Sequence, residues 1–183
     1  FKRGLRILID GAPYTILDTM VQTPSARGAS SLAKVKVRNM LTGQVFDKTF
    51  RSGERFDEPD LERRTIQYLY DDAEHRVFLD MESYDQIHVT PEELGDDGRF
   101  LTENLEVRAL FFDGRVLELE LPAALEFEVM EVEPGSRGDT AHGGVTKPAV
   151  LNNGLRIQVP LFVEAGERIR VSTKDGKFVE RVR

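Results

Sequence analysis

The sequence predicts an all-β protein made of three small β modules, and two patterns carry this prediction. Apolar and polar residues alternate with a period of two along most of the 183 residues, whereas the longer period of an amphipathic helix is nearly absent. Asp-Gly pairs at residues 10–11, 113–114 and 175–176 each separate two alternating runs. Because this dipeptide accepts the positive φ angles of a tight turn, each pair predicts a β-hairpin.

About a dozen short strands follow from the alternation. They are expected at residues 5–9, 14–19, 32–39, 45–50, 65–70, 76–80, 105–112, 116–121, 125–132, 155–159, 168–173 and 178–182. A single helical turn is expected at residues 91–94, because proline is favoured at the first position of a helix. Since the first residue is phenylalanine rather than methionine, a short natural N-terminus is expected to precede it.

Two changes in composition divide these strands into three modules. A turn-rich, acidic stretch covers residues 52–62, and a second change lies near residue 127, before a glycine-rich stretch at 134–144. The expected domains are 1–64, 65–127 and 128–183. Modules of this size bury only about 60% of the surface of the unfolded chain, so contacts between neighbouring domains should contribute to stability.

Charge separates the three modules. Residues 1–64 carry 12 Lys and Arg against 8 Asp and Glu, a net charge of +4. Residues 65–127 carry 4 against 16, a net charge of −12, and residues 128–183 carry 9 against 8, a net charge of +1. The whole chain has a formal net charge of −7, but local charge decides which surface can meet a nucleic acid. We therefore expect the basic first module to be the part that can face a nucleic acid, and the acidic central module to repel it.

The composition excludes several classes of function. The chain has no cysteine, so it can hold no disulfide, thiolate nucleophile or cysteine-bound zinc, which suits a cytoplasmic protein. No apolar run approaches the roughly 18 residues needed to span a bilayer. The histidines His75, His88 and His142 lie in separate segments without metal-ligand spacing, and no pair of carboxylates is tied to a pocket. We therefore expect a protein that is not an enzyme, with no catalytic residue, no metal and no cofactor.

A loop of small side chains with one cation is the most informative stretch of the chain. Its residues are Pro24, Ser25, Ala26, Arg27, Gly28 and Ala29. Proline and glycine shape the backbone, and the small neighbours leave the guanidinium of Arg27 as the only long group that can reach outward. An ordinary surface loop would have the same composition, but the strand that follows favours a loop that enters a narrow site beside phosphate groups.

That strand carries three cations, Lys34, Lys36 and Arg38, which alternate with small apolar residues. Since side chains of a strand point to opposite faces in turn, the strand should have one basic face and one apolar face. A solvated strand face would show the same alternation. Together with the Arg27 loop, however, the basic face predicts contacts with a phosphate backbone, which would be RNA for a factor of the family considered below.

The C-terminal module carries a segment, residues 147–166, that resembles the signature of the elongation factor P family. Eight positions agree with it: Lys147, Ala149, Gly154, Ile157, Val159, Pro160, Val163 and Gly166. From the residues alone, this segment predicts a hairpin that turns at residues 152–154 and a strand that ends at Pro160. We therefore expect these residues to have a structural role and to need no ligand.

The resemblance extends over essentially the whole chain, including residues 1–14, 41–43, 68–72 and 134–141. It implies an SH3-like (KOW-like) N-terminal barrel followed by two OB-fold barrels, with a tRNA-like overall shape. It also implies a monomeric translation factor that binds the ribosome between the P and E sites. There it would contact the CCA end of the peptidyl-tRNA and promote peptide-bond formation on consecutive prolines.

The tip of the loop departs from the common family pattern. Arg27 stands where most members of the family have a lysine that is extended by modification, and the loop is about two residues longer. In this respect it resembles the elongation-factor-P-like paralogue, which presents an arginine. Another branch glycosylates an arginine that follows Pro-Gly, whereas Ser25-Ala26 precedes Arg27 here. We expect Arg27 to be unmodified.

A second loop favours elongation factor P itself. Gly138, Asp139, Thr140 and Ala141 keep the pattern of the third-domain loop that approaches the E-site codon of the mRNA in that factor. A flexible surface loop would have the same composition. The subfamily therefore stays open. A general single-stranded nucleic-acid-binding OB protein stays as the alternative function, although the chain has no tryptophan for base stacking.

Overall fold

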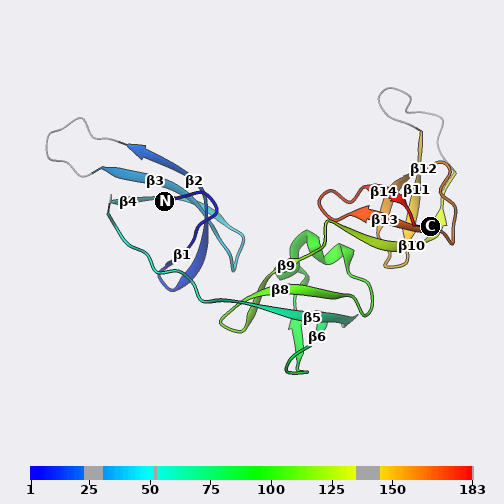
Figure 1. Ribbon diagram of the computed structural model, residues 1–183, viewed down its shortest axis with the longest axis horizontal. Helices are drawn as coiled ribbons and strands as arrows, with labels where there is room; N and C mark the ends of the chain where they lie inside the picture. Colours follow the sequence, from blue (N-terminus) through cyan, green and yellow to red (C-terminus); the bar gives the residue numbers. More distant parts are fainter. Residues whose placement is uncertain (23–30, 52, 135–144, 183) are drawn as a thin grey trace. The chain divides into compact units, whose positions relative to one another are not determined.

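The computed structural model describes residues 1–22, 31–51, 53–134 and 145–182, and β-strands make up nearly all of their regular structure. The strands form three antiparallel sheets, each drawn from one continuous stretch of sequence (Figure 1). By spatial proximity, the chain groups into two compact units. One unit holds residues 1–63 and 110–118, and the other holds residues 64–109 and 119–183.

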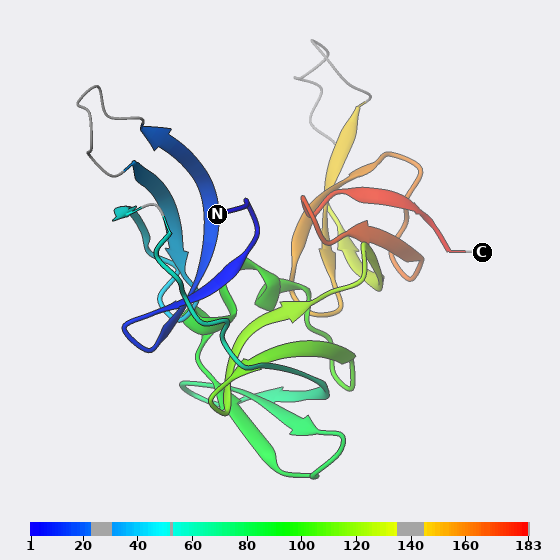
Figure 2. The same cartoon turned by 60° about the vertical axis from the view of Figure 1, so that its left-hand side comes forward.

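The first sheet has the strand order β1-β2-β3-β4. Its strands are β1 (Arg6–Ile9), β2 (Ala12–Gln22), β3 (Leu32–Asn39) and β4 (Val45–Arg51). The predicted turn at Asp10-Gly11 joins β1 to β2, with φ angles of 51° and 77° that suit a tight hairpin. The long strands β2 and β3 lie side by side and are paired as far as Gln22 and Leu32 (Figure 2).

One face of this sheet is buried. Its core comprises Ile7, Ile9, Tyr14, Ile16, Ala33, Val35, Val37 and Phe50. Alternate positions on β1 and β3 supply this core, as a period of two requires. The rings of Phe1 and Phe56 pack on Phe50, with centroid distances of 5.4 and 4.6 Å, and extend the apolar cluster beyond the strands.

The central sheet has the strand order β7-β6-β5-β8-β9. Its strands are β5 (Leu61–Asp71), β6 (Arg76–Asp80), β7 (Gln86–Val89), β8 (Glu106–Phe112) and β9 (Arg115–Glu120). Between β7 and β8 lie a helical turn, α1 (Pro91–Leu94), and a 3-10 segment, η1 (Gly95–Phe100). Thr90 and Glu93 form a capping box that fixes the start of α1.

The third sheet repeats this order as β12-β11-β10-β13-β14. Its strands are β10 (Ala124–Val132), β11 (Thr146–Leu151), β12 (Arg156–Pro160), β13 (Arg168–Ser172) and β14 (Phe178–Arg181). In both sheets the first strand is central, the second and third lie to one side, and the fourth and fifth lie to the other. This shared order identifies both sheets as the same OB-type fold.

The core of the third sheet includes one residue from the central part of the chain. Phe100, the last residue of η1, is fully buried among Phe127, Val129, Ile169 and other apolar residues of the third sheet. Both segments belong to the same compact unit. Contacts between neighbouring domains therefore contribute to burial here, as the small size of the modules predicts.

The all-β prediction is confirmed, and each predicted strand has a counterpart whose ends differ by a few residues. Two strands are absent from the predicted set, β7 and β11, although the hairpin predicted to turn at residues 152–154 implies β11 as its first arm. The domain boundary predicted after residue 127 falls inside β10 of the third sheet. The change in composition near residue 127 lies within this strand, so it does not mark a turn or a linker between domains. Within the described part of the chain, no helix is both long enough and apolar enough to cross a membrane.

Candidate functional site

The basic face of β3 is the first part of the candidate site. Lys34, Lys36 and Arg38 are exposed, whereas the apolar residues between them are buried. The predicted alternation of a basic and an apolar face is therefore confirmed. The buried face holds the strand in the core of the first sheet and fixes the direction in which the cations point.

Lys36, the middle cation, lies between two carboxylates. The pairing of strands places Asp18 of β2 and Asp47 of β4 directly opposite Lys36. Residues directly opposite one another on neighbouring strands share a face and lie close together. The two negative charges therefore weaken the field of Lys36, and the basic face is less uniform than its sequence predicts.

Lys34 and Arg38 have uncharged neighbours. Lys34 lies opposite Met20 and Thr49, and Arg38 lies opposite Thr15 and Val45 on the same two flanking strands. An extended strand places these two cations about 13 Å apart. Lys34, which lies nearer the Arg27 loop, and Arg38 are therefore the stronger candidates for phosphate contacts.

Apolar side chains surround the base of the predicted loop. Met20 and Val21 on β2 and Leu32 on β3 are exposed by 65, 72 and 40%. Val21 and Leu32 also line a hollow together with Phe1 and Phe56. Exposed apolar surface beside a basic strand can exclude water at an interface with another molecule.

The tip residues themselves lie outside the described residues. These are Pro24, Ser25, Ala26, Arg27, Gly28 and Ala29, and the same holds for Gly138, Asp139, Thr140 and Ala141 of the predicted codon loop. Their predicted roles stay predictions. What is described is the paired ladder of β2 and β3 that leads to the first of these loops.

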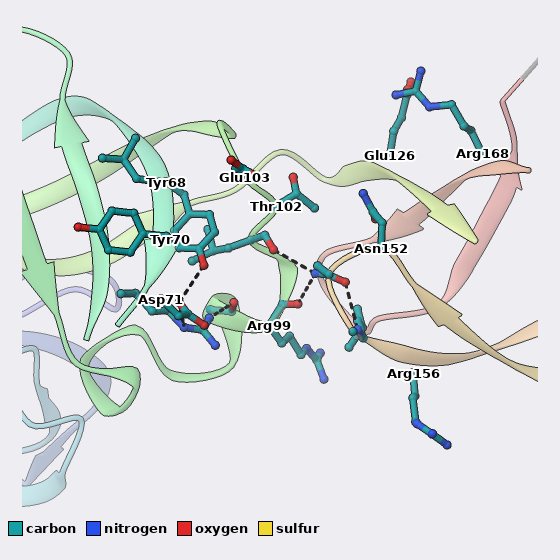
Figure 3. Close-up of a pocket in the computed structure, with 17 residues that line it drawn as sticks. Tyr68, Tyr70, Asp71, Arg99, Thr102, Glu103, Glu126, Asn152, Arg156 and Arg168 are labelled. Atoms are coloured by element: carbon teal, nitrogen blue, oxygen red, sulfur yellow. Dashed lines mark hydrogen bonds and ion pairs between the residues drawn. The ribbon is translucent and has the colours of Figure 1, made fainter. Parts of the chain in front are cut away.

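A polar hollow within the second compact unit was missed by sequence reasoning (Figure 3). Its lining combines aromatic, acidic and basic groups: Tyr68, Tyr70, Asp71, Arg76, Arg99, Glu103, Glu126, Arg156 and Arg168. Several of its cations are paired, since Arg168 lies 3.3 Å from Glu126 and Arg156 lies 3.3 Å from Glu133. Residues of the central and third sheets meet here only through folding, so no local pattern signals the hollow.

Tyr68 illustrates the polarity of this hollow. Its hydroxyl donates a 2.8 Å hydrogen bond to Asp71 Oδ1. Partial burial, together with this bond to a carboxylate, raises the pKa of Tyr68 to about 12. The phenol therefore stays neutral and keeps donating at physiological pH.

The signature segment, residues 147–166, connects the turn between β11 and β12 to the segment at residues 99–101 by hydrogen bonds. The side-chain amide of Asn153 donates to the carbonyl oxygens of Arg99, at 2.9 Å, and Leu101, at 3.1 Å. Its Oδ1 accepts from the Leu155 N–H at 3.1 Å, which fixes the turn between β11 and β12. This geometry confirms the predicted turn at residues 152–154, and β12 ends at Pro160 as predicted.

Two of the histidines, which lie in separate segments of the sequence, come together in the structure. The rings of His75 and His88 lie 5.8 Å apart, and the carboxylate of Asp72 lies beside both. Pairing of β6 with β7 brings them together, and β7 is one of the two strands that the sequence pattern missed. His142 lies outside the described residues.

Three family models match almost the whole chain. Residues 1–56 match the Elongation factor P (EF-P) KOW-like domain, and residues 61–119 match the Elongation factor P (EF-P) OB domain. Residues 125–181 match the model described as Elongation factor P, C-terminal. These ranges contain the strands of the first, central and third sheets, with β9 and β10 extending one residue beyond their ranges.

Related proteins share the length of this chain. The elongation factor P of Oleidesulfovibrio alaskensis is 45% identical over 181 residues, which cover 99% of this chain and 96% of that protein. The elongation factor P of Thermoanaerobacter sp. is 42% identical over 182 residues, which cover 100% and 97%. Among solved structures, the eukaryotic translation initiation factor 5A from Methanococcus jannaschii has a TM-score of 0.51 at 21% identity. It covers 65% of this chain and 90% of that one, and supports the fold alone.

A KOW-like sheet with a basic face, followed by two OB-type sheets, and the names of its relatives together define this chain as a translation factor. The chain belongs to the elongation factor P family.

Proposed function

We propose that this protein binds the ribosome between the P and E sites and promotes peptide-bond formation on peptidyl-tRNA that is stalled at consecutive prolines. The observation that carries the proposal is the first sheet. Its basic strand face and exposed apolar residues lead directly to the loop that contains Arg27. A translation factor that inserts a loop into RNA needs cations that bind phosphate groups beside the loop and a loop of small side chains that fits a narrow site.

The mechanism is positioning rather than covalent chemistry. A peptidyl-tRNA that carries prolines samples unproductive geometries, and a loop that contacts its CCA end would restrict that freedom. A tenfold acceleration needs only about 1.4 kcal/mol of preferential stabilisation of the productive geometry. A charge-assisted hydrogen bond from Arg27 to a phosphate or base edge is of that order. The ribosome performs the reaction, and the factor acts in the cytoplasm as a monomer without a catalytic residue.

The remaining contacts are assigned by the same reasoning. Lys34 and Arg38 would contact the RNA backbone, with a weaker contribution from Lys36 because carboxylates flank it. Residues 138–141 would approach the mRNA at the E site. The domain limits near residues 64 and 124 and an unmodified Arg27 are part of the proposal.

A reconstituted translation assay on a triproline reporter tests this function. Addition of the purified protein should accelerate peptide formation on the triproline template and leave a template without prolines unchanged. No acceleration at several-fold excess over ribosomes, with any native modification of Arg27 present, would refute the proposal. Tight binding to isolated single strands with no effect on translation would support the alternative nucleic-acid-binding function.

The state of Arg27 is measured directly. The peptide that contains Arg27, isolated from native cells, should have its unmodified mass. A mass increment at Arg27 would place the chain with the glycosylated branch of the family instead.

A further inference from the structure

One carboxylate and two imidazoles come together at the turn between β5 and β6. His75 Nδ1 lies 3.5 Å from Asp72 Oδ1, and His88 Nδ1 lies 3.7 Å from Asp72 Oδ2. A ligand atom from each of the three residues lies within 4.8 Å of the others. The side chains are partly exposed, so an ion from solvent can reach them.

Strand pairing holds these groups at one end of the sheet. Val77 on β6 pairs with His88 on β7, and His75 directly precedes β6, so the pairing of the two strands brings the two imidazoles together. Asp72 Oδ1 accepts hydrogen bonds from the N–H groups of Glu74, at 3.0 Å, and His75, at 2.7 Å. These bonds fix the carboxylate, while Oδ2 faces His88.

We propose that Asp72, His75 and His88 bind a divalent transition-metal ion, with Zn²⁺ as the best fit. Zinc takes imidazole nitrogen and carboxylate oxygen at about 2.0–2.2 Å in a tetrahedron, whose ligand atoms lie about 3.4 Å apart. Each imidazole lies at about this spacing from one oxygen of the Asp72 carboxylate, His75 at 3.5 Å from Oδ1 and His88 at 3.7 Å from Oδ2. One ligand atom from each of the three residues lies within 4.8 Å of the others, so small side-chain rotations would bring all three onto one ion. Two imidazoles disfavour Mg²⁺ and Ca²⁺, which prefer oxygen ligands.

The surrounding charge favours a cation. Residues 65–127 carry a net charge of −12, which raises the local concentration of positive ions. Arg76, the neighbouring cation in sequence, lies 3.4 Å from Asp71 instead. Arg76 therefore neutralises Asp71 rather than Asp72.

A bound ion would connect the turn at residues 72–75 to β7, which lies at one end of the strand order. Three protein ligands leave a fourth tetrahedral position for water or for a donor group of a partner. Because the ion binds only where the three ligands are assembled, it would also stabilise the folded central domain. This inference goes beyond the proposed action on the ribosome and does not depend on it.

Calorimetric titration of the full chain with ZnCl₂, after removal of metals by a chelator, tests the site. The wild-type protein should bind one equivalent of Zn²⁺, and MgCl₂ should give no binding at the same concentration. His75→Ala, His88→Ala and Asp72→Asn should each weaken the binding of Zn²⁺ by at least about 100-fold, since loss of even an outer partner costs 10–100-fold. Asp72→Asn keeps the oxygen that accepts the turn N–H groups.

His142→Ala is the matched control and should bind Zn²⁺ as the wild type does. Equal melting temperatures of all variants in chelator would show that the substitutions remove a ligand and not the fold. If a variant does not fold, NMR of the wild-type protein tests the site instead. Addition of Zn²⁺ should then shift the imidazole ring signals of His75 and His88. No binding of Zn²⁺ by the wild type, persistence of binding in both single histidine variants, or its loss in His142→Ala would overturn the proposal.

Discussion

The first and central sheets are folded by the same rule but carry opposite charge. Each alternates buried apolar and exposed polar residues, and each has a fully buried isoleucine in its core, Ile16 in the first and Ile66 in the central sheet. Yet residues 1–64 carry a net charge of +4, and residues 65–127 carry −12. The buried apolar face therefore determines the fold, whereas the charge of the exposed face can vary and determines which partner the sheet can bind.

The largest expected effect tests the buried apolar cores that the first and central sheets have in common. Ile16→Ala and Ile66→Ala should each lower the free energy of unfolding by about 2–5 kcal/mol, because each leaves a cavity in a packed core. Urea unfolding followed by circular dichroism measures both. Val45→Ala, at a position exposed by 47%, is the control and should change stability by no more than about 0.5 kcal/mol. A cost below 1 kcal/mol at either isoleucine would show that the two cores are not equivalent.

The next largest effect concerns Arg27, in the positively charged residues 1–64. Arg27→Ala should leave the melting temperature nearly unchanged and lower the rate of triproline peptide formation by about tenfold, equivalent to 1.4 kcal/mol. The defect should persist at saturating factor, because a positioning contact acts after binding. Full recovery at high concentration would mean that Arg27 only contributes to affinity.

A smaller effect is expected for Tyr68, in the negatively charged residues 65–127. Tyr68→Phe should lower the free energy of unfolding by about 0.5–1 kcal/mol near neutral pH, because it removes the hydrogen bond to Asp71. The pKa of Tyr68 is raised from 10.0 to about 12 in the folded state, so its stabilising contribution is complete below pH 10. It is lost as the pH rises through about 12.

Unfolding experiments at pH 9, 10.5 and 12 measure this difference between wild type and Tyr68→Phe. The gap in stability should shrink as the pH rises. Tyr84→Phe, at a tyrosine exposed by 70%, is the control and should show no such gap. A gap that stays constant to pH 12 would contradict the role of Asp71.

The smallest expected effect separates two cations on one strand. Lys34→Ala should reduce the slope of log affinity for ribosomes against log salt by about 0.7–0.9, the value for one lost phosphate contact. Lys36→Ala should reduce it less, because Asp18 and Asp47 flank that lysine. Glu106→Ala on the central sheet should not reduce it. Equal slopes for the two lysine variants would show that the flanking carboxylates do not matter.

Sequence reasoning predicts the fold where the signals are local. Alternation places most strands, and the Asp-Gly turn at residues 10–11 is found with both φ angles positive. The basic and apolar faces of β3 follow from the same period. The role of residues 152–154 as a turn is also predictable, because asparagine and glycine are turn residues wherever they occur.

The parts that could not be predicted depend on pairing between segments. β7 has only four residues, too few to show a clear period, and without it the meeting of His75 with His88 is invisible. The carboxylates that flank Lys36 lie 18 and 11 positions away in sequence and become its neighbours only through strand register. The hydrogen bond from Asn153 to Arg99 likewise needs the folded structure.

The placement of Phe100 limits how the chain can be recombined. Its ring comes from the segment that follows the central strands, yet it fills the core of the third sheet. A fragment that begins at residue 124 would lack this ring and expose the apolar surface that it covers. Exchange of the C-terminal domain between relatives should therefore succeed only when the segment that contains residue 100 is exchanged with it.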